Sequence, residues 1–97
     1  MLIKDYPKTL KIKDALWEVK FVSEIEKGGK YETLGLCDPY DQIIYIRLRQ
    51  TRKERFMTFL HELVHAMDHE YKIGIPHDMV VKLERPLAEL WIANYVG

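Results

Sequence analysis

The 97-residue chain has almost no cysteine, no excess of charge of either sign and no long apolar run. Its single cysteine, Cys37, excludes an intramolecular disulfide, and small secreted domains usually carry several. No segment is apolar over the roughly 20 residues that a membrane helix needs, and residues 1–14 do not have the pattern of a signal peptide. These absences favour a cytoplasmic protein.

The charged side chains cancel, because 15 Lys and Arg residues stand against 15 Asp and Glu residues. A chain with balanced charge has little general attraction for phosphate groups, so we expect neither a nucleic-acid partner nor a membrane-surface partner. The length suits a single domain over residues 1–97, and the sequence leaves the oligomeric state open.

Alternation of apolar and polar residues predicts the strands. It favours strands over residues 9–13 and 16–23, and the second of these carries Trp17, Val19 and Phe21 on one face. Residues 24–32 are charged and contain two adjacent glycines, which predicts a turn or loop. Residues 33–49 read as a β-hairpin around the turn sequence Asp-Pro-Tyr-Asp at 38–41.

Two helices are predicted after the strands. Thr51 and Glu54 form a capping-box pattern at the start of a helix over residues 52–72, and Gly74 supplies a stop. A second helical pattern covers residues 79–95, with Asp78 as a candidate N-cap. Pro86 conflicts with an unbroken second helix, so we expect either a kink near Lys82 or a break that makes Pro86 the first turn of a new helix. The fold class is therefore α+β, with a small antiparallel sheet of three or four strands packed on two helices.

The first helix contains the sequence His61-Glu62-Leu63-Val64-His65, an H-E-x-x-H motif. Residues four apart lie on one face of a helix, so both imidazoles can reach one metal ion. Zinc accepts imidazole nitrogen and acidifies its bound water, and Glu62 can take a proton from that water as it attacks a carbonyl. Asp68 follows His65 by about one turn and is a candidate hydrogen-bond partner for its ring.

A catalytic zinc site normally has three protein ligands, and the third must come from downstream of the motif. Glu84 is the preferred candidate, because a carboxylate among apolar neighbours on the second helix needs a partner. Glu89 and His77 remain alternatives. His69 lies about 12 Å along the helix from His61, so it shares the metal only if the helix breaks.

The run F-L-H-E-L-V-H-A-M-D-H-E-Y at residues 59–71 resembles the core of small zinc metallopeptidase-like proteins of phage and bacterial genomes, of the ImmA/IrrE type within the gluzincin class. Residues 35–47 are similar to the strand pair that leads into the motif helix of such proteins. The resemblance implies a minimal zincin fold, with His61, His65 and Glu84 as Zn²⁺ ligands and Glu62 as general base. It also implies that an edge strand from residues 33–49 binds an extended peptide.

The function expected from motif and resemblance together is a zinc-dependent metallopeptidase that hydrolyses peptide bonds, with Glu62 activating zinc-bound water. Its partner would be a peptide or protein substrate. The alternative from another class is a non-catalytic, zinc-stabilised protein-binding module on the same scaffold. A third possibility is an α+β interaction domain that holds no metal.

Overall fold

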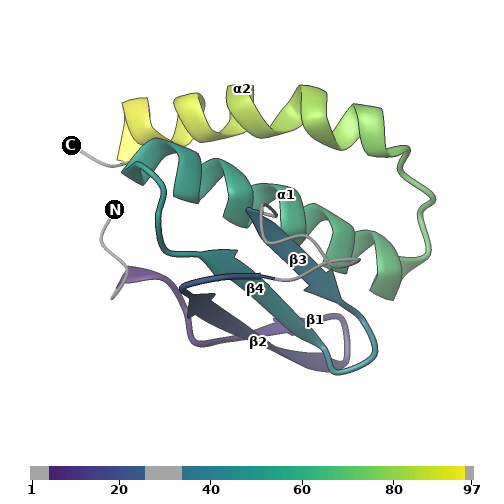
Figure 1. Cartoon of the computed structure of the whole chain (residues 1–97). Helices are drawn as coiled ribbons and strands as arrows, with labels where there is room; N and C mark the ends of the chain where they lie inside the picture. Colours follow the sequence, from purple (N-terminus) through teal and green to yellow (C-terminus); the bar gives the residue numbers. More distant parts are fainter. Residues whose placement is uncertain (1–4, 26–33, 96–97) are drawn as a thin grey trace.

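The computed structural model describes residues 5–25 and 34–95 of the chain. Four strands come first, and two helices follow (Figure 1). The strands are β1 (Thr9–Ile12), β2 (Ala15–Val22), β3 (Gly35–Asp38) and β4 (Ile43–Arg47), and the helices are α1 (Arg52–Tyr71) and α2 (His77–Tyr95). The expected α+β class is confirmed, whereas most of the loop predicted over residues 24–32 lies outside the described residues.

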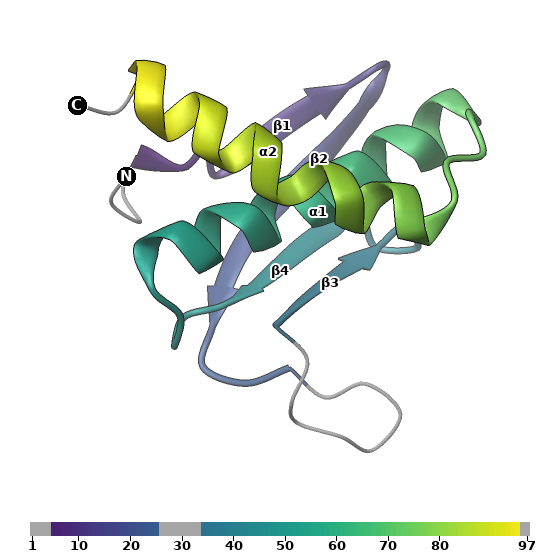
Figure 2. The same ribbon diagram turned by 90° about the horizontal axis from the view of Figure 1, so that it is seen from above.

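The sheet is mixed, with the strand order β1-β2-β4-β3. β1 pairs with β2 and β3 pairs with β4, both antiparallel, as expected. The expectation of a wholly antiparallel sheet is wrong at one pair, because β2 and β4 run parallel. The chain passes from β2 to the far edge of the sheet before it forms β3. The β3–β4 hairpin then brings β4 back beside β2 in the same direction as β2, and β3 is left as an edge strand (Figure 2).

α1 begins as the sequence predicts. The Thr51 side chain accepts a hydrogen bond from the backbone N–H of Glu54, and the Glu54 carboxylate accepts one from the N–H of Thr51. This reciprocal pair satisfies two backbone donors that the first helical turn leaves unpaired. At the other end Lys72, rather than Gly74, takes the left-handed conformation that closes the helix, with φ at 54°.

α2 is one continuous helix from His77 to Tyr95, with Pro86 inside it. The predicted break at Pro86 is therefore wrong, although the proline still removes one helical hydrogen bond. Asp78 lies inside the first turn and is not the N-cap, because the helix starts one residue earlier. The carbonyl of Pro76 instead accepts hydrogen bonds from the N–H groups of Met79 and Val80.

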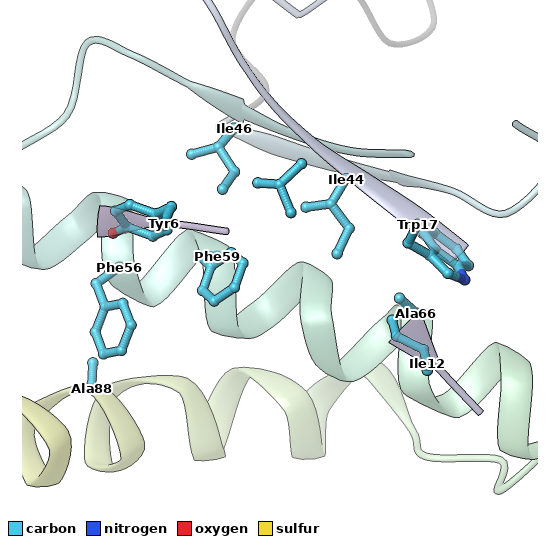
Figure 3. Packing of buried hydrophobic residues seen from close by; sticks show 10 residues of the cluster. Tyr6, Ile12, Trp17, Ile44, Ile46, Phe56, Phe59, Ala66 and Ala88 are labelled. Carbon is cyan, nitrogen blue, oxygen red and sulfur yellow. The ribbon is translucent and has the colours of Figure 1, made fainter. Parts of the chain in front are cut away.

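The elements form three layers, with α1 lying between the sheet and α2 (Figure 1). The core fills the space between sheet and α1 and includes the fully buried Trp17, Ile44 and Ile46 on the sheet side (Figure 3). Phe56 and Phe59 face them from α1. The sheet covers one side of α1, and α2 covers another. A further side of α1 lies beside the edge strand β3.

Within residues 5–25 and 34–95, no helix combines the length and the apolar character that crossing a membrane requires.

Ile44 provides a direct test of this core. We expect Ile44→Ala to lower the free energy of unfolding by about 2–5 kcal/mol, because the side chain is fully buried and its loss leaves a cavity. Leu16→Ala is the matched control: its side chain is 63% exposed, and the expected change is within about 0.5 kcal/mol. Urea unfolding measures both. Equal losses in the two variants would contradict the described packing.

Candidate metal centre

The buried stripe of α1 contains a carboxylate. Phe59, Glu62 and Ala66 follow one another at three- and four-residue steps, and all three are buried against the sheet. Glu62 is only 8% exposed. His61 and His65 lie on the neighbouring face of α1 and are half-buried. One helix therefore presents two imidazoles to a cleft and holds a carboxylate beneath them.

Three histidines gather at this point. The Nε2 atoms of His61 and His65 are 3.2 Å apart. His77, the first residue of α2, lies against both rings, at centroid distances of 5.0 Å from His61 and 5.4 Å from His65. One nitrogen from each of the three rings falls within 4.8 Å of the others, so this group could hold a metal ion.

The separation of one pair of these nitrogens is that of two ligands on one metal ion, and zinc provides the comparison. Zinc binds imidazole nitrogen at about 2.0–2.1 Å in tetrahedral geometry, which places two ligand nitrogens about 3.3 Å apart. The observed 3.2 Å between the Nε2 atoms of His61 and His65 agrees with that value. Three imidazole ligands would leave a fourth tetrahedral position open, as catalytic zinc sites require.

Glu84 lies on the opposite side of the His61 ring. Its Oε2 atom is 2.6 Å from Nδ1 of His61, while Nε2 of the same ring faces His65. The two nitrogens of an imidazole point in diverging directions, so a group bonded at Nδ1 does not share an ion bound at Nε2. A carboxylate in this position accepts a hydrogen bond from Nδ1–H and so favours the tautomer whose Nε2 can bind a metal. The sequence-based expectation that Glu84 binds the metal directly stays a prediction. The contact seen here is a hydrogen bond to His61.

The loop between the helices delivers His77 to the cluster. Asp68 Oδ1 accepts hydrogen bonds from the N–H groups of Gly74, at 2.6 Å, and Ile75, at 3.1 Å. Sequence reasoning offered Asp68 as a partner for the ring of His65. That contact stays a prediction, and the hydrogen bonds of Asp68 to Gly74 and Ile75 hold residues 74–75, just before His77, in place.

The remaining candidates from the sequence lie away from the cluster. Glu89 pairs with Lys53 at 2.8 Å on the surface, near the start of α1, and this cation lowers the pKa of the Glu89 carboxyl. The helix continues without a break past His65, so the ring of His69 lies edge-on to Trp17, with 6.4 Å between the ring centroids. Neither side chain belongs to the three-histidine group.

A cavity opens directly over the cluster. Its volume is about 350 Å³, and its walls come from α1, β3 and the start of α2: Gly35, Leu36, Cys37, His61, Glu62, His65 and His77. A second cavity of about 320 Å³ shares His61, Glu62 and Gly35 and extends toward the start of α1. The two form one cleft that runs along α1 beside the edge strand.

The edge strand turns backbone hydrogen-bonding groups toward this cleft. The N–H of Arg47 donates to the carbonyl of Leu34, so residues 34 and 47 form a hydrogen-bonded pair of the β3–β4 ladder. Such pairs alternate along an antiparallel ladder, so Leu36 also bonds to β4. Gly35 and Cys37 therefore direct their N–H and C=O groups to the free edge, where an extended peptide can pair with them.

The thiol of Cys37 is poorly suited to nucleophilic chemistry. Burial, reinforced by the negative charges of Glu62 and Asp38, raises its pKa to about 12. The thiolate, which is the reactive form, is therefore scarce at neutral pH.

Comparisons with protein families, with curated proteins and with solved structures gave no match for this chain.

Two variants separate a metal ligand from a residue that orients one. We expect Glu84→Gln to weaken zinc binding by about 10–100-fold, the usual cost of losing a partner of a ligating histidine. His77→Ala removes a ligand atom and should weaken binding by more than that. Competition with a chromophoric chelator measures both affinities, and Glu89→Gln, on the surface, is the control. A larger loss in Glu84→Gln than in His77→Ala would make Glu84 the ligand.

Alkylation tests the environment of Cys37. At pH 8 we expect iodoacetamide to modify the folded protein at least about 100-fold more slowly than the urea-unfolded chain, because the raised pKa leaves little thiolate. Mass spectrometry over time follows the reaction. Comparable rates in the two states would contradict the raised pKa and the burial that causes it.

Proposed function

We propose that this chain is a zinc-dependent metallopeptidase whose zinc ligands are His61, His65 and His77. The observation that carries the proposal is the convergence of three imidazole nitrogens beside a buried carboxylate and a free strand edge. A zinc ion alone has many uses in proteins. Hydrolysis of a peptide bond also needs a base next to the ion and a means to align an extended chain, and both lie within the same cleft.

Each group of the cleft has a part in the proposed reaction. Bound zinc would act as a Lewis acid that polarises the substrate carbonyl and makes water more acidic. Glu62 accepts the proton of the attacking water and returns it to the departing amine, so that the carboxylate is regenerated. Glu84 holds the ring of His61 through Nδ1, and Asp68 holds the loop before His77. The ring of His61 and the loop before His77 are thus held in place before substrate arrives.

The proposed substrate is an extended segment of a peptide or protein. It would add a strand beside β3 through the N–H and C=O groups of Gly35 and Cys37. Such pairing uses the peptide backbone, so it aligns the chain without demanding particular side chains. The resemblance of residues 59–71 to the ImmA/IrrE type of metallopeptidase supports this assignment and is independent of the cleft geometry.

Glu62→Gln tests the reaction itself. We expect the variant to bind zinc as the wild type does, because Glu62 is not among the three ligands, and to lose at least about 100-fold in kcat, because an amide cannot accept the proton. Metal analysis and cleavage of a denatured or peptide substrate library give the two readouts. Zinc binding in the wild type without any cleavage would favour the non-catalytic, zinc-stabilised binding module instead.

A further inference from the structure

β3 approaches α1 closely at Gly35, beside Thr58 and Glu62. A Cβ atom built on Gly35 would lie 2.9 Å from Glu62 Oε2 and 3.1 Å from Glu62 Cγ. It would also lie 2.5 Å from Cγ2 of Thr58. Side chains almost never tolerate contacts below 3.0 Å, so only glycine fits here without displacing its neighbours.

The two neighbours differ in their freedom to move away. The single O–H of Thr58 is shared between Oε1 of Gln50, at 2.7 Å, and the carbonyl of Glu54, at 2.9 Å, and this bifurcated bond holds the side chain. Gln50 is itself tied through its amide to the carbonyls of Leu34 and Arg47. The Glu62 carboxylate stands at the end of a longer, more flexible side chain. An added Cβ at position 35 would meet Thr58 Cγ2 at 2.5 Å and Glu62 Oε2 at 2.9 Å, so its insertion would displace the carboxylate relative to the edge strand.

We infer that Gly35 is a positioning residue for Glu62: its missing side chain lets the carboxylate lie against the edge strand, level with the backbone groups that Gly35 turns to the cleft. The peptide bond that pairs with Gly35 and the carboxylate that acts on it are then set by one residue. This inference rests on the proposed peptidase function for its catalytic consequence, and on the contacts alone for its structural part.

For the proposed reaction, we expect Gly35→Ala to lower kcat much more than it changes KM. Gly35→Ala keeps the N–H and C=O of the free edge, so KM should change by less than about threefold. It displaces the base, so kcat should fall at least about tenfold, as expected when a catalytic group is misplaced by about 1 Å. Zinc content should stay at the wild-type value, because the atoms nearest to the added Cβ belong to Thr58 and Glu62 and not to a proposed ligand.

The rescue variant is Gly35→Ala with Thr58→Ser. Serine keeps the hydroxyl that bonds Gln50 and Glu54, and it removes the methyl group that lies 2.5 Å from the added Cβ. The freed space lets the new methyl group tilt away from Glu62, so kcat should recover by at least about threefold. Thr58→Ser alone is the control and should stay within about twofold of the wild type. No recovery in the double variant, or loss of zinc in Gly35→Ala, would overturn the inference.

Thermal unfolding supplies a readout that does not need activity. Gly35→Ala should lower Tm by about 4 °C or more in the wild type, and by clearly less in the Glu62→Ala background, where the crowded carboxylate is gone. Equal Tm losses in both backgrounds would contradict the contact between positions 35 and 62. A wild type that cleaves no peptide, together with unequal Tm losses, would instead refute the proposed function and leave the contact intact.

Discussion

The site depends on the position of one acidic side chain within the apolar stripe of a helix. Glu62 occupies a sheet-facing position between Phe59 and Ala66, where an aliphatic residue would otherwise complete the core. Burial of a carboxylate costs free energy that must be recovered through its interactions. Glu62 is 8% exposed, so the chain has a carboxylate where an apolar side chain would pack better. Such departures from ideal packing are typical of functional sites. The rest of the site follows from this placement, because His61 and His65 must then lie on the neighbouring face, beside the cleft.

The second helix adds a third imidazole to the pair on α1, and the resulting group could hold a metal ion. Two imidazoles from one helix make a weak site, and the third nitrogen comes from His77, at the start of α2. The short connection after α1 is held by Asp68, so His77 returns to the cluster with little freedom. Glu84 lies two turns further along α2 and contacts the far side of the His61 ring. One helix therefore supplies both a ligand candidate and the group that orients another ligand.

Much of the fold could be predicted from local patterns in the sequence. The capping box at Thr51, the alternation around Trp17 and the turn after Cys37 each depend on neighbouring residues, and each was predicted correctly. The parallel pairing of β2 with β4 could not be predicted in this way, because it depends on the path of a long connection. The continuity of α2 through Pro86 is also a tertiary result, since packing on α1 offsets the lost hydrogen bond.

The same division applies to the site. The four-residue spacing of His61 and His65 predicts that both can bind one metal ion. The types of the downstream side chains made His77 and Glu84 candidates for the third ligand. Which nitrogen of His61 each partner faces depends on how α2 crosses α1, which the spacing cannot reveal. Gly35 was placed in a strand but not linked to Glu62. Its signal was a glycine inside a strand, which often marks a close approach of another chain segment.

The most direct test of the account is X-ray absorption at the zinc K-edge of the wild-type protein loaded with one equivalent of zinc. We expect a first shell with three imidazole nitrogens at about 2.0–2.1 Å and one oxygen ligand. A first shell of two imidazoles and a glutamate carboxylate would contradict the assignment of His77 and place Glu84 on the metal. A spectrum of hydrated zinc without imidazole scattering would contradict the metal centre itself.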